Sequence, residues 1–176
     1  DGRDAEEIRS RVADATGVPS DAVIVTTTHT HAGPSLSAAG DDYRQMMYDR
    51  TTESAVQAWE SRFPARVGSG TTRVLSVGRN RRKLLYGGLH PDPEVLVMKV
   101  EDAAGTVRGV LFNFGCHPST LDWRNRLISE DWPYYAIRDI RAAHGDSVWV
   151  GYVQGAQGDI NAGYSAELSA VGVSMP

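Results

Sequence analysis

The chain has 176 residues, 41% of them hydrophobic and 23% charged, with a formal net charge of −4. This composition fits one globular domain with a core of its own, and the slightly acidic balance argues against a nucleic-acid-binding protein, which would show a basic face. The single cysteine, Cys116, excludes an internal disulfide and a cysteine-based zinc cluster. No apolar run approaches the ~20 residues that span a bilayer, so we expect no transmembrane segment.

The first half of the sequence predicts two helices separated by a strand. Asp4, with Glu7 three residues later, gives a capping-box pattern at the start of the first helix. The strand is indicated by β-branched side chains in an apolar run. The second helix has an apolar side at helical spacing and is stopped by Pro64. The expected ranges are 4–16 and 41–63 for the helices and 22–28 for the strand.

The second half predicts further strands and a third helix. Two short strand-like segments come first, followed by a hairpin around the sequence DAAG. Asp131 is expected to cap the helix, with Pro133 in its first turn. The expected strands are 65–69, 72–77, 94–101, 107–114 and 147–153, and the helix is 131–144. We therefore expect an α/β domain with a mixed sheet and flanking helices.

Three of the expected strands, 22–28, 107–114 and 147–153, run directly into polar loops with the sequences HTHAGP, GCHPST and QGAQGD. In open α/β sheets, ligands bind beyond the carboxyl ends of the strands. If the three strands are parallel and adjacent, the three loops converge. We expect the functional site at that point.

Histidines in two of these loops indicate a metal site at the C-terminal ends of the strands. His29 and His31 are two residues apart, which in extended backbone places both side chains on one face. His117 lies in the second loop, stiffened by the proline that follows it. Neutral imidazole is the commonest metal ligand and suits zinc. The alternative is that these histidines are structural, buried against backbone groups or solvated.

The third loop offers groups that complement a metal. Backbone amides at Gly155 and Gly158 can face an anion or an oxyanion. Asp159 can orient a histidine or ligate a metal, and its alternative role is to form a turn. Cys116 is most simply a buried apolar residue. A thiol nucleophile remains an alternative, although His117 beside it points to the opposite face.

A set of motifs in fixed order resembles the N-terminal domain of the neutral/alkaline non-lysosomal ceramidase family. The motifs are THTHAGP, NRR, DPEVLVMKVED, FNFGCHPSTL, ISEDWPYYA and VQGAQGDIN, spread over residues 20–162. Members of that family are zinc amidohydrolases that cleave the N-acyl bond of ceramide. The resemblance implies that His29 and His117 are zinc ligands, that His31 is the neighbouring active-site histidine, and that Arg81 lies on the substrate side.

The chain departs from the family pattern in two ways. The family completes its zinc shell with a Glu and a Tyr further along the chain, and neither has a matching motif here. We therefore expect residues 1–176 to be a single partial domain, a fragment of a longer protein, with residues 163–176 poorly ordered. Where the family has a nucleophilic serine this sequence has Asn161, whose amide can only bond to a substrate or an oxyanion.

Together these features predict a zinc-dependent hydrolase of a C–N amide bond, acting on an N-acyl-sphingosine or a related lipid amide with metal-activated water. His31 would move protons, Asn161 and the backbone amides of the third loop would hold the oxyanion, and Asp131 and Asp159 would orient the histidines. The alternative is a catalytically inactive or incomplete ceramidase-like domain that binds a ligand. The resemblance also implies a secreted or periplasmic protein and a peripheral membrane contact in the longer protein.

Overall fold

The computed structural model describes residues 2–36, 38–80, 92–121 and 125–162. Arg81 and the segment 163–176 lie outside the described residues, so the expectations for both stay predictions. The chain forms two compact units. Unit 1 consists of Asp1–Thr26 and Pro34–Phe63, and unit 2 of Thr27–Gly33 and Pro64–Pro176.

Unit 1 is a pair of packed helices, α1 (Gly2–Thr16) and α2 (Gly40–Glu60), with the short 3-10 helix η1 (Ser20–Ala22) between them. Helix α1 buries Ile8 and Val12 because positions four residues apart share one face of a helix. It begins two residues before the expected cap. Asp4 instead lies within the first turn, where its carboxylate accepts a 2.6 Å hydrogen bond from the Tyr48 hydroxyl.

The strand expected over residues 22–28 is wrong. Ala22 ends η1, and the backbone from Val23 to Thr30 forms neither helix nor strand. The side chain of Ile24 is 86% exposed. β-branched residues favour a strand only where a neighbouring strand packs against them, and within the described ranges no strand pairs with this segment. His29 therefore does not follow a strand.

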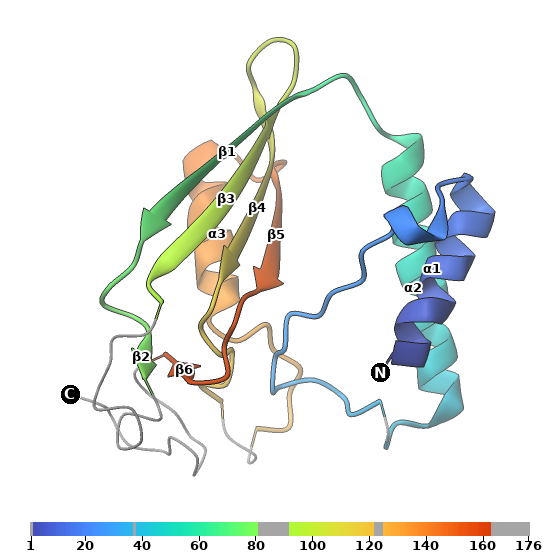
Figure 1. Cartoon of the computed structure of the whole chain (residues 1–176), viewed down its shortest axis with the longest axis horizontal. Coiled ribbons are helices and arrows are strands. Elements are labelled where there is room, and N and C mark those ends of the chain that lie inside the picture. The colour runs from blue at the N-terminus through green and yellow to red at the C-terminus, as the bar shows by residue number, and fades with distance from the viewer. Residues whose placement is uncertain (1, 37, 81–91, 122–124, 163–176) are drawn as a thin grey trace. The chain divides into compact units, whose positions relative to one another are not determined.

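Unit 2 is built on a mixed sheet of four strands in the order β1-β3-β4-β5 (Figure 1). These strands are β1 (Arg66–Arg73), β3 (Glu94–Glu101), β4 (Val107–Phe114) and β5 (Trp149–Gln154). Strands β1, β3 and β4 pair antiparallel, while β5 pairs parallel to β4. The hairpin expected at 94–101 and 107–114 is confirmed. In place of the two short strands expected at 65–69 and 72–77 there is one strand, β1, and residues 74–77 lie outside it. A second, two-stranded sheet pairs β2 (Arg79–Asn80) with β6 (Ile160–Asn161).

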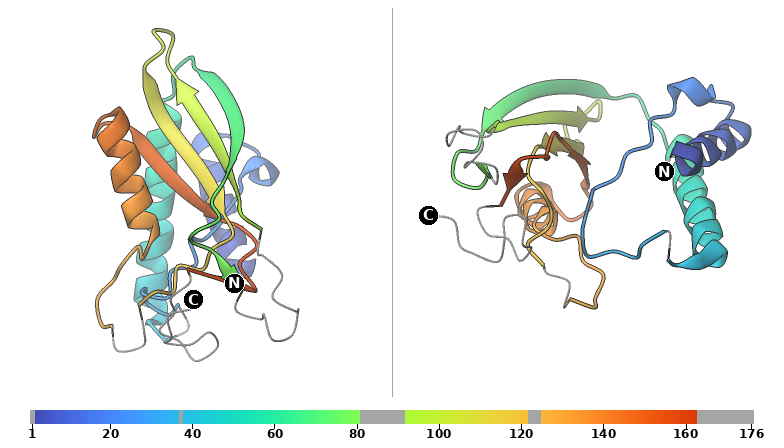
Figure 2. Two further views of the ribbon diagram at one scale, coloured as in Figure 1. Left: turned by 90° about the vertical axis from the view of Figure 1, so that its left-hand side faces the viewer. Right: turned by 60° about the horizontal axis from the view of Figure 1, so that its bottom comes forward.

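Helix α3 (Pro133–His144) connects β4 to β5 and covers one face of the large sheet (Figures 1 and 2). Strand β4 buries Val110, Phe112 and Phe114 on that face, because alternate residues of a strand point the same way. Ala136 and Ile140 of α3 pack against them. Each fully buried side chain of this kind stabilises the fold by about 1.5–3 kcal/mol. The α/β class and the mixed sheet are confirmed.

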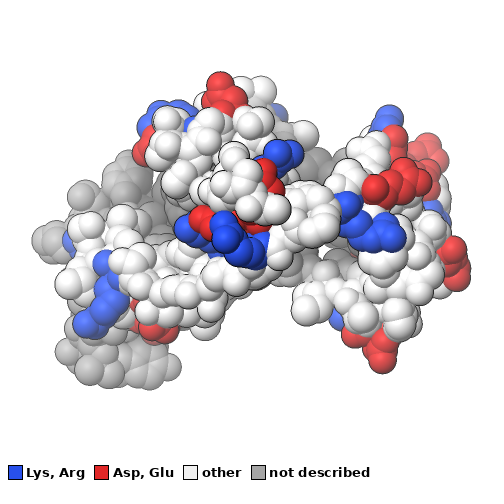
Figure 3. Space-filling view, turned by 90° about the horizontal axis from the view of Figure 1, so that it is seen from above, with Lys and Arg blue, Asp and Glu red and all other residues white. Residues whose placement is uncertain are grey.

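Charged side chains of both signs share the part of the surface that Figure 3 shows. On the face seen in Figure 3, Lys and Arg side chains are interspersed with Asp and Glu side chains. Among the described residues, no helix has both the length and the apolar character needed to cross a membrane.

Candidate metal centre

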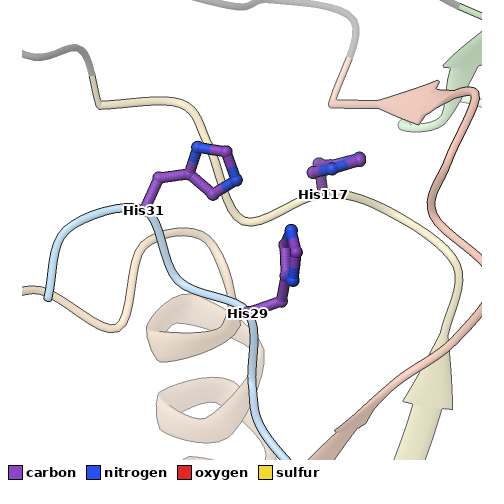
Figure 4. Close-up of side chains that lie close together, drawn as sticks. All are labelled: His29, His31 and His117. Atoms are coloured by element: carbon purple, nitrogen blue, oxygen red, sulfur yellow. The ribbon is translucent and has the colours of Figure 1, made fainter. Parts of the chain in front are cut away.

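Three histidines meet at one point of unit 2 (Figure 4). His29 and His31 belong to the loop 27–33, and His117 lies three residues beyond the end of β4. One ring nitrogen from each histidine lies within 4.8 Å of the corresponding nitrogens of the other two. The ring centroids are 5.1 to 5.7 Å apart. The expected convergence of His29 and His117 is therefore confirmed.

The side chains of His29 and His31 are brought together by the left-handed backbone at His29 and not by an extended strand. His29 has a left-handed φ of 59°, so His29 and His31 do not lie on one face of an extended chain as expected. This conformation is uncommon outside glycine, although histidine adopts it more often than most residues. It costs on the order of 1–3 kcal/mol and persists only where neighbouring contacts hold it. One such contact is the Thr30 hydroxyl, which donates to the Ser129 carbonyl at 2.7 Å.

His117 is oriented by a hydrogen bond to backbone through one of its two ring nitrogens. It is 5% exposed, and its Nδ1 lies 3.0 Å from the carbonyl oxygen of Ile160. A carbonyl only accepts, so Nδ1 carries the proton and Nε2 is the ring nitrogen that can act as an acceptor or ligand atom. Metal-binding histidines are typically oriented in this way. With three imidazoles in reach of one point, the donor set fits zinc.

Asn161 lies beside His117. Strand β6 ends at Asn161, which forms an isolated parallel bridge with His117, and bridged residues direct their side chains to the same face. Asn161 is 2% exposed, and its amide oxygen has no hydrogen-bond partner among the described residues. A buried acceptor without a partner costs about 1–3 kcal/mol. This oxygen therefore marks a place where a ligand or a water would bind favourably.

The two loop glycines and Asp159 lie just before Asn161. Gly155 donates its N–H to the Phe114 carbonyl at 3.0 Å, which engages the amide expected to face an oxyanion. Gly158 and Asp159 lie in a turn closed by a 2.9 Å bond from the Ile160 N–H to the Gln157 carbonyl. A turn is the alternative role considered for Asp159, and its role toward a histidine stays a prediction.

Asp131 was expected to cap helix α3, and the structure places it just outside the cap position. Asp131 lies one residue before the N-cap of α3, which is Trp132, and its carboxylate accepts from the backbone N–H of Thr120 and of Trp132.

Cys116 is fully buried, and this burial raises the pKa of its thiol to about 12, with a further contribution from the charge of Asp131. The thiol is therefore protonated at neutral pH, which disfavours the cysteine-nucleophile alternative.

The sequence did not point to Tyr152 and Gln154, whose side chains hydrogen-bond to the backbone that leads to His117. The hydroxyl of Tyr152 lies 3.0 Å from the Phe114 carbonyl and 2.8 Å from Oε1 of Gln154. Gln154 Nε2 donates to the Cys116 carbonyl at 3.3 Å. Burial raises the pKa of Tyr152, so its hydroxyl stays a donor. The available signal was the glutamine that ends an apolar strand in the motif VQGAQGD.

Solved structures of ceramidases share this fold. A ceramidase complexed with C2 has a TM-score of 0.70 and 21% sequence identity, covering 90% of this chain and 29% of that chain. Neutral ceramidase from Pseudomonas aeruginosa has a TM-score of 0.68 and 21% identity, covering 89% of this chain and 29% of that chain. No protein-family model and no curated protein matches the sequence.

This chain thus spans 29% of the length of each of these ceramidases. At 21% identity, the likeness shows the fold. The resemblance expected from the sequence motifs is therefore confirmed, and the chain folds as a segment of neutral ceramidase does.

Proposed function

We propose that this chain is the histidine-bearing part of a ceramidase-like hydrolase that cleaves a C–N amide bond of an N-acyl-sphingosine or a related lipid amide. The observation that carries this proposal is the convergence of three imidazoles at one point of a ceramidase fold. A ceramidase solved in complex with C2 supports the substrate class. Contact with a membrane surface in a longer protein is part of the same proposal.

Zinc is the proposed metal, with His29 and His117 as its ligands from this chain. The hydrogen bond from His117 Nδ1–H to the Ile160 carbonyl supports this role, because it fixes the ring and makes Nε2 the nitrogen with ligand character. When bound, zinc supplies a Lewis acid and lowers the pKa of a water to about 7. Further ligands of the shell, a Glu and a Tyr by family resemblance, would come from outside this sequence.

His31 is proposed as the group that handles protons. It is exposed, and its ring centroid lies 5.2 Å from that of His29 and 5.7 Å from that of His117. This position lets its ring take a proton from water and deliver it to the departing amine.

Asn161 is proposed to bind the amide group of the substrate. Its unpartnered oxygen would accept a hydrogen bond from the substrate N–H, and its NH₂ group would donate to the developing oxyanion. The backbone amide of Gly158 is a second proposed donor, and the substrate-side arginine is proposed to be Arg81. Gly155 would support this loop by packing, since its own N–H is bonded to Phe114.

A second candidate function is a ceramidase-like domain that binds the lipid amide without cleaving it. Asn161 favours this alternative, because an amide cannot act as the nucleophile that the family's serine provides. In that case the histidines and Asn161 would bind the ligand, and no product would form.

The two candidates are separated with the zinc-loaded longer protein, which also supplies the proposed Glu and Tyr ligands, by incubating it with an N-acyl-sphingosine that carries a fluorescent acyl group. We expect release of the fluorescent fatty acid, with loss of release in Asn161→Ala and in His29→Ala. Saturable binding without release would establish the ligand-binding candidate. Neither release nor binding, in a folded protein that contains zinc, would overturn both.

A further inference from the structure

The segment Ser129–Trp132 is hydrogen-bonded to both histidine loops. On one side, the Ser129 N–H donates to the Ala32 carbonyl at 2.9 Å, and the Ser129 carbonyl accepts from the Thr30 hydroxyl at 2.7 Å. On the other side, the indole N–H of Trp132 donates to the carbonyl of His117 at 3.2 Å. The segment thus touches residues on either side of His31 and touches His117 itself.

Asp131 is the centre of this segment. It is 5% exposed, and both carboxylate oxygens accept two hydrogen bonds each. Oδ1 accepts from the Thr120 hydroxyl at 2.8 Å and from the Trp132 N–H at 2.7 Å. Oδ2 accepts from the N–H groups of Thr120 at 2.9 Å and of Leu121 at 3.1 Å. Charge-assisted bonds of this kind are about twice as strong as neutral ones, and they are what makes a buried carboxylate tolerable.

The backbone at Asp131 also serves this arrangement. Its φ of 61° is left-handed, a conformation that aspartate and asparagine adopt more readily than other side chains. The Ser129 hydroxyl accepts from the Asp131 N–H at 3.0 Å. The turn therefore directs the carboxylate back toward Thr120 and Leu121, which follow His117 by three and four residues.

The two histidine loops are also joined directly. The N–H of His31 donates to the Pro118 carbonyl at 3.1 Å. Because Pro118 lies between His117 and the residues that Asp131 holds, a change in the path of Thr120 and Leu121 moves the acceptor of His31. The segment around Asp131 is thus linked by hydrogen bonds to the neighbours of His31 and to the backbone that follows His117.

We propose that Asp131 is a positioning residue that sets the spacing of His29, His31 and His117 before any metal binds. Its carboxylate contacts the backbone that carries the histidines, and it is not itself a ligand. The inference rests on the proposed zinc site for its functional meaning, whereas the preset spacing is a property of the metal-free chain and is measured separately.

The test is Asp131→Asn in the full chain, with Asp139→Asn as the matched control. Asparagine keeps the left-handed turn, but its NH₂ group faces N–H donors where an oxygen now accepts. Asp139 lies on α3 with 67% of its side chain exposed, so its change to Asn touches no part of the site. Zinc affinity, measured by competition with a chromophoric chelator, is expected to fall about 10–100-fold in Asp131→Asn and to stay unchanged in Asp139→Asn. Wild-type affinity in a folded Asp131→Asn variant would overturn the proposal.

A second pair of variants covers the case in which Asp131→Asn does not fold. Thr120→Val removes the hydroxyl that donates to Asp131 at nearly constant shape, while Thr120→Ser keeps it. We expect weaker zinc binding in Thr120→Val and rescue in Thr120→Ser, with a matching loss and recovery of the tetrahedral absorption of bound cobalt. Equal affinity in the two variants would refute the positioning role.

Amide exchange of the metal-free chain separates this inference from the proposed function. If the wild-type chain binds no zinc, the zinc proposal fails, and the inference is judged on the exchange rate of the His31 N–H. Faster exchange in Asp131→Asn than in Asp139→Asn supports the preset spacing, and equal rates overturn it.

Discussion

The substitution Gly155→Ala tests the close packing that places the second and third loops against each other. A β-carbon on Gly155 would lie 3.0 Å from the backbone nitrogen of Gly115 and 3.0 Å from the carbonyl carbon of Phe114. Both are backbone atoms of the segment that leads to His117, so neither can move without shifting β4 or the histidine loop. Glycine is required at position 155 because this segment and the segment Phe114–Gly115 approach each other too closely for a side chain.

The expected cost is that of overpacking, about 1–3 kcal/mol in the free energy of unfolding. For a chain of this size, that lowers the melting temperature by about 2–12 °C. The matched control is Gly158→Ala in the same loop, where a β-carbon meets nothing within 4 Å, and its effect should stay below about 0.5 kcal/mol. Thermal unfolding followed by circular dichroism measures both. Equal melting temperatures for the two variants would refute the packing described here.

Three further predictions follow from the buried groups and the histidines. Tyr152→Phe should lower the free energy of unfolding by about 1–3 kcal/mol in urea titrations, because the amide of Gln154 and the neighbouring carbonyls lose a buried partner; an unchanged midpoint contradicts this. The pKa of Cys116 is raised from 9.0 to about 12, so the native state binds more protons than the unfolded state in that range. Stability should therefore fall as the pH rises above about 9, and this slope should be shallower in Cys116→Ala; identical slopes would argue against the raised pKa. His31→Ala should keep bound zinc but lose about 10²–10⁴-fold in hydrolysis, whereas loss of zinc comparable to His29→Ala would make His31 a ligand.

The sequence predicts those elements whose signal is local. The hairpin at 94–101 and 107–114 follows from alternating apolar residues around a turn, and both strands have the expected bounds. Helix α3 ends at His144, as expected from the glycine that follows it. Each of these signals lies within the element itself, so no distant contact is needed to read it.

Failures occur where structure depends on distant partners. Residues 22–28 have the composition of a buried strand, but a strand forms only against a neighbour, and no sequence window reports one. The left-handed backbone of His29 is equally invisible in sequence, because it is held by contacts such as the one from Thr30 to Ser129. The convergence of the histidines was correctly expected, but of the three strands expected to run parallel only β4 and β5 do so, because residues 22–28 form no strand.

The neighbours of the site also come from far along the chain. Asn161 reaches His117 through a bridge between segments more than forty residues apart, and Asp131 reaches Thr120 across a loop. Asp131 was expected to orient the histidines, and its four hydrogen bonds instead hold the backbone around them. The order of the motifs indicated which residues lie close together. The fold is needed to show which atoms of these residues are in contact.

The most direct test is the zinc content of the longer protein that carries this chain and the proposed Glu and Tyr ligands, measured by elemental analysis after dialysis against zinc. A single zinc ion per chain is predicted for the wild type and for His144→Ala, which changes an exposed histidine at the end of α3. His29→Ala and His117→Ala are each predicted to lose the ion while remaining folded. A folded wild-type longer protein without zinc, or full occupancy in either of these two variants, would contradict the proposed zinc site.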